Sequence, residues 1–214
     1  MVPRGRIELP TPAFSARRST NELPRRCFNK ITRKSYVVNN LYLVYNRAMK
    51  NVFKGKLLKL FVKKIRLPNG YLATFEIIKH PGAALVVPFL SKDRLIMLRQ
   101  LRPVIRSYIY ELPAGTIDKG ETSLECARRE IVEETGYSAK KMKLLGSIYP
   151  VPGYSTEKIT IYKADGLLPK YRHAEKDEII ELKILTKGAV RRLFKSGKIV
   201  DAKTIAALAF CRWL

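Results

Sequence analysis

Cysteine is scarce in this sequence. The 214 residues contain Cys27, Cys126 and Cys211 and no other cysteine. Three scattered cysteines are too few for a disulfide framework, and the lack of any CxxC pair argues against a zinc site. We therefore expect a protein of a reducing compartment, the cytoplasm.

Histidine and long apolar runs are scarce as well. His80 and His173 are the only histidines, and His80, which precedes a Pro-Gly pair, is expected to have a structural role. The apolar run at residues 41–45 is far shorter than the roughly 20 residues that a membrane-spanning helix needs. The N-terminus also lacks the basic region, apolar core and cleavage site of a secretory signal. We expect neither membrane insertion nor export.

Acidic residues are outnumbered, because 18 Asp and Glu stand against 42 Lys and Arg, which gives a formal net charge of +24. A positive field of this size attracts nucleic acid, anionic lipid or phosphorylated small molecules, and charge alone does not choose among them. The first 48 residues hold ten Lys and Arg and the two acids Glu8 and Glu22, so they contribute about +8 and leave about +16 for the remainder. The body of the chain is therefore basic in its own right.

Residues 1–48 show neither helical nor strand periodicity, and four prolines and two arginine pairs interrupt them. We interpret this segment as a disordered basic extension. It resembles translation from a reading frame drawn too long, so we hypothesise that the native protein starts at Met49. Peptides from residues 1–48 in the endogenous protein would contradict this. A basic arm for nucleic acid is the competing interpretation.

From Met49 the sequence changes to short β-rich runs. Residues 49–80 are predicted to form a small N-terminal antiparallel β subdomain, because Leu58, Leu60 and Val62 alternate along one run and residues 67–70 carry a turn signal. Residues 81–214 are predicted to form the main domain. Its strands are expected at 83–90, 94–101, 108–112, 143–149, 158–164 and 178–185, with a helix at 123–135 and two helices at the C-terminal end. This order predicts an α/β (α+β) fold in which a mixed β-sheet lies between helices.

The helix at 123–135 has clear signals at both ends. Thr122 and Glu125 form a capping box that begins a helix, and Gly136 suits the left-handed conformation that ends one. One face carries an apolar stripe that we expect to be buried, formed by Leu124, Ala127 and Ile131.

Another face of the same helix gathers three carboxylates. Glu130, Glu133 and Glu134 stand at i, i+3 and i+4, and like charges at this spacing destabilise a helix by about 0.2–0.5 kcal/mol per pair. A hard divalent cation would offset the repulsion, and oxygen ligands favour Mg²⁺ or Mn²⁺ over zinc. Arg129 can hold one carboxylate by a bidentate contact. The alternative is a solvated acidic face, which would be unusual in so basic a chain.

These residues resemble the Nudix box: a Gly, five residues, a Glu, seven residues, Arg-Glu, a bulky aliphatic residue, any residue, Glu-Glu, any residue and Gly. The fixed positions are filled by Gly115, Glu121, Arg129, Glu130, Ile131, Glu133, Glu134 and Gly136. Tyr137 departs from the pattern, since the family usually has an aliphatic residue there, and this affects packing more than chemistry. The signal is specific, and we identify the chain as a member of the Nudix hydrolase family.

The resemblance implies a metal site and a reaction. It implies that Glu130, Glu133 and Glu134 bind divalent cations, that Glu121 supports them, and that a backbone carbonyl at Ala114 or Gly115 adds a ligand. In such a site the cations neutralise charge on the diphosphate and activate a water molecule for in-line attack on phosphorus.

Several segments outside the box resemble the ADP-ribose pyrophosphatase branch of the family. They lie in the order of that group at residues 67–70, 80–83, 99–102, 111–115, 152–153 and 196–204. The resemblance implies substrate contacts from Arg102, Arg99, Glu111, Pro152 and Gly153. A solvated or ion-paired side chain is the alternative for Arg102 and Arg99, and an ion pair is the alternative for Glu111. Tyr108 and Tyr110 are candidates for stacking on adenine or for core packing.

Glu157 lies in a segment where related enzymes carry a loop glutamate that acts as general base, and it joins Glu133 and Arg129 as an expected catalytic residue. Glu175 and Glu178 are the alternatives for the base. Members with a similar N-terminal β-region build their substrate site between two chains, so the resemblance also implies a homodimer.

The predicted function is hydrolysis of a nucleoside diphosphate compound, with ADP-ribose giving AMP and ribose 5-phosphate. Another nucleotide sugar or a dinucleoside polyphosphate is the closest alternative substrate. An RNA-directed protein is an alternative from another class, suggested by the basic charge, although no aromatic and glycine RNA-binding motif is present. A silent ADP-ribose sensor is a third, but silent members would be expected to lose box glutamates, and all are present.

Overall fold

Strand β4 (Ala83–Pro88) forms the centre of the fold, because every one of its residues is buried. The structure is a computed structural model that describes residues 50–55, 58–171 and 178–214. The predicted extension at 1–48 and the candidates His173 and Glu175 lie outside the described residues.

The elements follow the predicted order. The remaining strands are β1 (Lys50–Lys54), β2 (Lys59–Arg66), β3 (Leu72–Lys79), β5 (Arg94–Arg102), β6 (Ser107–Glu111), β7 (Ala114–Thr116), β8 (Tyr137–Ile148), β9 (Ile159–Pro169) and β10 (Ile180–Thr186). The helices are η1 (Pro103–Ile105), α1 (Ser123–Thr135), α2 (Lys187–Lys195) and α3 (Ala202–Phe210). No described helix has the length and apolar character needed to cross a membrane.

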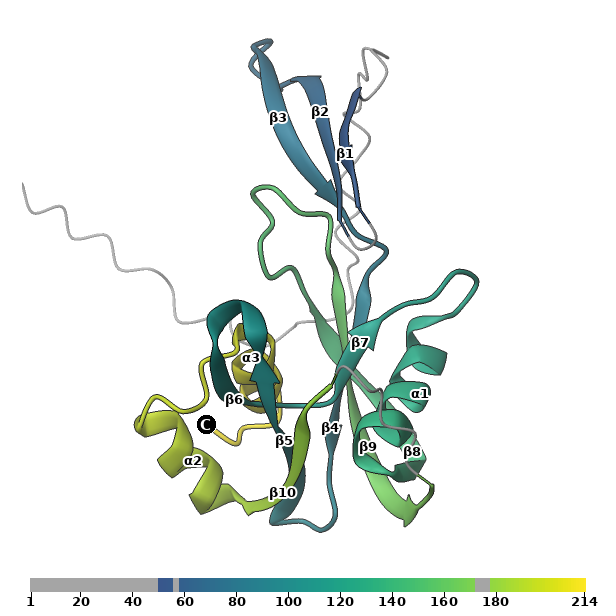
Figure 1. Cartoon of the computed structure of the whole chain (residues 1–214), viewed down its shortest axis with the longest axis vertical. Coiled ribbons are helices and arrows are strands. Elements are labelled where there is room, and N and C mark those ends of the chain that lie inside the picture. Colours follow the sequence, from purple (N-terminus) through teal and green to yellow (C-terminus); the bar gives the residue numbers. More distant parts are fainter. Residues whose placement is uncertain (1–49, 56–57, 172–177) are drawn as a thin grey trace, which may run out of the picture. The chain divides into compact units, whose positions relative to one another are not determined.

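A four-stranded mixed sheet in the order β7-β4-β9-β8 carries helices on both faces. Strands β4 and β9 run parallel, and the other neighbouring pairs are antiparallel. Side chains alternate along β4, so Ala84 and Val86 pack with α1 whereas Leu85 and Val87 pack with residues of α2 and α3. Figure 1 shows α1 on one side of this sheet and α2 and α3 on the other. The predicted fold, a mixed sheet between helices, is confirmed.

Two smaller antiparallel sheets complete the described fold. Strands β10, β5 and β6 form one, in which β5 is central. Strands β1, β2 and β3 form the other, at the N-terminal side. The turn predicted at residues 67–70 joins β2 to β3, where Gly70 N–H donates to the carbonyl of Leu67 at 2.9 Å. Strand β3 leads directly into the segment before β4.

Candidate functional site

Helix α1 is fixed at both ends and along its buried face. Thr122 accepts a hydrogen bond from the backbone N–H of Glu125, whose side chain accepts from Thr122 in return, and Gly136 ends the helix at φ 72°. Ala127 and Ile131 are buried against the sheet as predicted. The prediction was wrong for Leu124, which is 37% exposed, because the buried arc runs through Cys126 instead.

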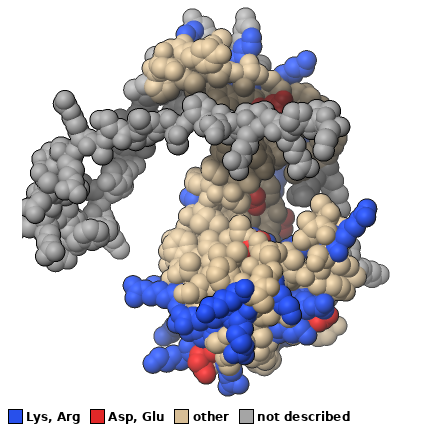
Figure 2. All heavy atoms as spheres, turned by 90° about the vertical axis from the view of Figure 1, so that its left-hand side faces the viewer, with Lys and Arg blue, Asp and Glu red and all other residues tan. Residues whose placement is uncertain are grey.

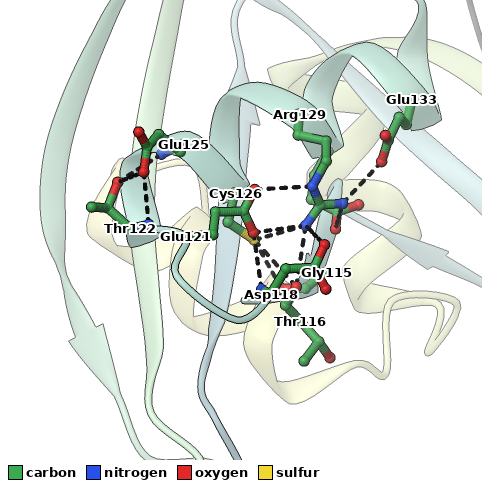
Figure 3. A network of polar contacts seen from close by, with 10 residues as sticks. Gly115, Thr116, Asp118, Glu121, Thr122, Glu125, Cys126, Arg129 and Glu133 are labelled. Atoms are coloured by element: carbon green, nitrogen blue, oxygen red, sulfur yellow. Dashed lines mark hydrogen bonds and ion pairs between the residues drawn. The ribbon is translucent and has the colours of Figure 1, made fainter.

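Arg129 joins the acidic side chains of this helix to the loop that precedes it (Figure 3). Its guanidinium donates two hydrogen bonds of 3.0 Å to Glu121, one of 2.7 Å to Glu130 and one of 2.9 Å to Glu133. A further bond of 3.2 Å reaches the carbonyl of Thr116. The bidentate contact, predicted for one carboxylate of the helix cluster, is made instead to Glu121 in the preceding loop, and the same guanidinium donates one bond each to Glu130 and Glu133. Arg129 holds the pKa of Glu121 below its ordinary value.

Glu130 and Glu134 are the buried acids of the cluster, at 8% and 5% exposure. Burial raises the pKa of Glu130 to about 7, opposed by Arg129 and assisted by the charges of Glu133 and Glu178. Burial also raises the pKa of Glu134 well above its ordinary value, and Glu130 and Glu178 add to the effect. A cation bound beside these two buried carboxyls would favour their ionised forms and so offset the cost of burying two negative charges.

The backbone of β7 approaches these carboxyls closely. Ala114 donates its N–H to Glu134 at 2.9 Å. A Cβ atom added to Gly115 would lie 1.6 Å from a carboxylate oxygen of Glu130, so only glycine leaves room for that side chain. The carbonyl of Gly115 lies 3.5 Å from the buried thiol of Cys126, whose pKa burial raises to about 12. The predicted Ala114 and Gly115 positions are thus beside the acids, although a thiol occupies the space near one carbonyl.

A second polar network adjoins the site at the end of β5 and β6. Arg102 donates to both oxygens of Glu111, which is 2% exposed. Lys203 also reaches Glu111 at 3.3 Å and pairs with Asp201 at 2.9 Å. The ion pair that was the alternative for Glu111 is therefore present. Because Glu111 holds the guanidinium in one orientation, Arg102 is a prearranged cation that is still partly exposed.

Arg99 is paired on the neighbouring strand. It donates to Glu181 at 2.6 Å, and its guanidinium lies 4.1 Å from the ring centre of Tyr108. The structure thus shows the ion-paired alternative for Arg99. Tyr108 is 39% exposed and stacked on Arg99, so it is not a core residue.

The β8–β9 connection carries Pro152, Gly153 and Glu157. Pro152 and Gly153 are exposed, in a turn closed by a 3.0 Å bond from the N–H of Ser155 to the carbonyl of Val151. Glu157 follows in the same connection and donates its backbone N–H to the hydroxyl of Ser155 at 3.1 Å. Glu157 was predicted to lie in a loop, and it does lie in the loop between β8 and β9. Glu178, by contrast, acts electrostatically on Glu130 and Glu134.

The NUDIX domain family matches residues 79–208, which include every element from β4 to most of α3. The chain belongs to the Nudix family.

Individual relatives agree with this assignment. The chain is 36% identical over 165 residues to ADP-ribose pyrophosphatase of Bacillus subtilis (strain 168), a match that covers 76% of this chain and 89% of that protein. It is 37% identical over 161 residues to the methanol dehydrogenase activator of Bacillus methanolicus, covering 74% and 87%. A crystal structure of an ADP compounds hydrolase has a TM-score of 0.69 at 24% identity, covering 77% of this chain and 90% of that one, and it shows the shared fold. The predicted family, fold and hydrolase class are confirmed.

The Nudix box of this chain fits a divalent cation in its chemistry. Glu130 and Glu134 are buried carboxyls with raised pKa values, and Glu130 fills the space that Gly115 leaves open. Within the described ranges, no three acidic, His or Cys side chains are gathered closely enough to hold an ion. Figure 3 shows the Arg129 side chain between Glu121 and Glu133, and its guanidinium also donates to Glu130. A bound cation would compete with Arg129 for these oxygens.

The sequence predicted the acidic residues of the site but not the residues that hold them in place. Thr204 accepts the N–H of Leu112 at 2.9 Å, and Asp201 caps α3, so the C-terminal segment holds the strand that carries Glu111. The resemblance of residues 196–204 to the branch signature pointed to this segment without giving it a role. Nothing local to the sequence pointed to Lys203 as the partner of Glu111, because 92 positions separate them.

Proposed function

We propose that this Nudix enzyme hydrolyses the diphosphate bond of ADP-ribose and releases AMP and ribose 5-phosphate. The observation that carries the proposal is the arrangement of the box: Glu130 and Glu134 are buried beside the backbone of Ala114 and Gly115. The relatives named ADP-ribose pyrophosphatase support the choice of substrate.

We propose Mg²⁺, or Mn²⁺ in its place, as the cation of this site, since the candidate donors are carboxylate and carbonyl oxygens. When bound, the cation supplies positive charge to the two phosphates and lowers the pKa of a coordinated water. The ligands proposed are Glu130, Glu133 and Glu134, with Glu121 and a carbonyl at Ala114 or Gly115 in support.

The remaining groups of the site orient the substrate. Arg129 aligns three carboxylates from one guanidinium, which fixes their spacing before the substrate arrives. Arg102, held by Glu111, presents N–H groups to a phosphate or ribose oxygen. Arg99, which is paired with Glu181, is proposed as a further substrate contact, and the turn at Pro152 and Gly153 would lie against the substrate.

Two glutamates compete for the role of general base. Glu157 is the proposed base, because it lies in the β8–β9 connection, where related enzymes carry a loop glutamate in this role. Glu178 is the alternative, supported by its electrostatic effect on Glu130 and Glu134. The variants Glu157→Gln and Glu178→Gln separate the two, since the base variant should lose kcat, with the acidic limb of its pH profile removed, and the other should not.

A substrate panel tests the proposed function. The purified chain would be incubated with ADP-ribose, nucleotide sugars, dinucleoside polyphosphates and capped RNA in Mg²⁺, and the products separated by chromatography. We expect the highest kcat/KM with ADP-ribose, and AMP with ribose 5-phosphate as products. A preference for capped RNA would move the chain to the RNA-directed class, and no turnover of any compound would refute the proposal.

Glu134→Gln tests the metal ligands within the same assay. We expect a loss in kcat of roughly 10²-fold or more, the range for removal of an electrostatic catalytic term. Glu76→Gln, a change of the same kind on β3, is the matched control and should keep full activity. A Glu134→Gln enzyme with the native rate would show that Glu134 is not a ligand.

A second candidate is regulation of a dehydrogenase, favoured by the similarity to the methanol dehydrogenase activator. Adding the native chain and its Glu134→Gln variant to a methanol dehydrogenase reaction tests it. Stimulation by both would indicate an effect that does not need hydrolysis.

We also propose that the enzyme is a homodimer and that it acts in the cytoplasm. The exposed apolar residues of β1–β3 support the dimer, among them Val52 and Phe53. The three scattered cysteines support a reducing compartment.

A further inference from the structure

A cavity of about 570 Å³ lies at the end of the four-stranded sheet away from the Nudix box, and its volume is in the usual range for ligand pockets. Ala84 of β4 pairs with Gly115 of the box, whereas Phe89, in the cavity wall, follows five residues later, which is roughly 16 Å at the rise of a strand. Residues of β8, of β9, of the turn after β4 and of the end of α3 complete the wall. None of the residues in the wall belongs to the Nudix box or to the network of Arg102 and Glu111.

Three aromatic side chains give the cavity an apolar wall. Phe89 and Trp213 are buried and meet edge to face, with ring centres 5.2 Å apart and ring planes at 72°. Phe210 is the accessible ring, since it is 47% exposed. A planar ligand can therefore stack on Phe210 while Phe89 holds Trp213 in place.

A bulge in β8 shapes the wall beneath Phe210. The register of β8 and β9 shifts between Leu144 and Gly146, which makes Leu145 the extra residue of a bulge. Successive strand residues normally face opposite sides of a sheet, but Leu145 packs on the α2 and α3 side and Gly146 lies under Phe210 on the same side. A Cβ atom added to Gly146 would lie 3.0 Å from two carbons of the Phe210 ring, so the glycine leaves space for that ring.

The chain after α3 takes an unusual conformation that brings Trp213 to the wall. Arg212 has φ 56°, in the left-handed region that glycine usually fills at the end of a helix. The N–H of Trp213 donates to the carbonyl of Leu208 at 2.9 Å, and the carbonyl of Trp213 accepts from Arg191 at 3.1 Å. Hydrogen bonds to both backbone groups of Trp213 thus fix the position of its indole.

The charge of the wall is positive on balance. Lys92 and Lys163 stand against one acid of the wall, Asp165. The ammonium of Lys163 lies 2.9 Å from Asp165 and 4.9 Å from the ring centre of Phe89. Burial raises the pKa of the Cys211 thiol, and Lys163 opposes this increase more strongly than Asp165 adds to it. The potential that these two charges produce at the thiol is therefore positive, which favours an anion in the cavity.

We propose that this cavity binds a planar aromatic acid, with its ring against Phe210 and Leu145 and its carboxylate beside Lys163. Stacking on Phe210 favours a flat ring over an aliphatic chain, and the excess positive charge favours an anion over a neutral or cationic compound. The proposal goes beyond the proposed hydrolysis and does not depend on it, because no residue of the wall takes part in that reaction.

Trp213 allows binding at this site to be measured directly, because it is the only tryptophan of the chain and lies in the wall. Its fluorescence would be recorded during titration with 4-nitrobenzoate, whose nitroaromatic ring quenches indole emission on contact. The neutral 4-nitrobenzamide and the cationic 4-nitrobenzylammonium are the matched probes. We expect saturable quenching by 4-nitrobenzoate with a Kd about threefold to fivefold lower than that of 4-nitrobenzamide, the range for a partly exposed ion pair, and the weakest binding for the cation.

Two variants with matched controls test the contacts of the probe. Phe210→Ala should weaken binding of 4-nitrobenzoate and 4-nitrobenzamide roughly fivefold, because a stacked pair of rings is lost. Phe194→Ala, at a phenylalanine of α2 that is 40% exposed, should leave both affinities unchanged. Lys163→Met should remove the preference for 4-nitrobenzoate over 4-nitrobenzamide. Lys183→Met is its control and should keep the preference, since Lys183 is also a strand lysine paired with an acid at 2.9 Å and is 39% exposed against 35% for Lys163.

Glu134→Gln separates this cavity from the Nudix box. The variant should bind 4-nitrobenzoate as tightly as the native chain, and a loss of binding would assign the probe to the Nudix box and overturn the proposal. Quenching that rises linearly with concentration, as it does for N-acetyltryptophanamide in solution, would show collisions without a binding site. Equal affinities for the three probes would overturn the anionic ligand, and native affinities in Phe210→Ala would overturn the stacked ring.

Discussion

Gly115 leaves the space that the Glu130 carboxylate occupies. In Gly115→Ala the new Cβ would lie 1.6 Å from a carboxylate oxygen, so the side chain of Glu130 must move away from the backbone of β7. A shift of this kind at a ligand should weaken metal binding about 10–100-fold, the usual cost of disturbing the support of a metal site. The measurement is activity as a function of Mg²⁺ concentration.

Gly188→Ala is the control for this substitution. The Cβ added there meets only a guanidinium nitrogen of Arg192 at 3.6 Å, which is ordinary contact. It should keep the native dependence on Mg²⁺. If Gly115→Ala kept it as well, the carboxylate of Glu130 would have no part in holding the cation.

Glu130 makes the stability of the metal-free protein depend on pH. Its pKa in the folded chain is about 7 against an ordinary 4.5, so the folded state binds the proton more tightly than the unfolded state. The stability it contributes is therefore fully present below pH 4.5 and lost as the pH rises through 7. In EDTA, Glu130→Gln should raise the free energy of unfolding at pH 8 by about 2 kcal/mol relative to the native chain, with no such gain at pH 4.5.

Denaturant titrations at the two pH values measure this difference. Saturating Mg²⁺ at pH 8 should reverse it, because the native chain gains stability from a bound cation and the variant gains less. An equal effect of Glu130→Gln at both pH values would mean that Glu130 ionises in the folded chain as easily as in the unfolded chain.

At the scale of elements, α1 depends on its N-terminal cap. Thr122 and Glu125 exchange hydrogen bonds, and those from Thr122 lower the pKa of Glu125. Thr122→Ala removes the side-chain acceptor and should cost about 1 kcal/mol in the free energy of unfolding, whereas Thr122→Ser keeps an oxygen and should cost less. Thermal denaturation of both variants measures the costs. Equal midpoints for Thr122→Ala and the native chain would show that burial alone fixes the start of the helix.

The same cap explains why α1 could be predicted within its observed bounds. The helix begins at the capping box of Thr122 and Glu125 and ends at Gly136, and these signals depend only on residues within one turn of each end. Strand β8 was predicted from residue 143 but begins at Tyr137, because its first half carries the exposed Lys140 and Lys141 and becomes a strand by pairing with β9. Strand β7 was not predicted at all, since three small residues become a strand only by pairing with β4.

The candidate site likewise contains features that local sequence predicts and features that depend on the tertiary fold. The acids of α1 follow from helical spacing, so their common face was predictable. The extent of the Arg129 contacts was not, because it requires the loop to bring Glu121 back over the helix. The electrostatic influence of Glu178 on Glu130 and Glu134 likewise depends on the path of the chain after β9, which no local pattern specifies.

At the scale of the whole molecule, positive charge predominates, since 42 Lys and Arg stand against 18 Asp and Glu. On the face drawn in Figure 2, Lys and Arg gather in the lower part, and acidic side chains are few among them. Such a field draws in anions such as nucleoside diphosphates and is screened by salt. It does not account for the apolar surface of the N-terminal sheet.

That apolar surface leads to a prediction about assembly. Val52 and Phe53 of β1 are 55% and 56% exposed, on the described sheet of β1, β2 and β3. A small sheet with exposed apolar side chains is a site for association. Light scattering after size exclusion should therefore give about twice the chain mass of 24.5 kDa.

Val52→Glu should shift the protein to monomer. Val200→Glu, a matched change at a residue that is 54% exposed and lies outside this sheet, should leave the dimer intact. A native chain that elutes as a monomer at all concentrations would contradict the dimer, and a dimeric Val52→Glu would place its interface elsewhere.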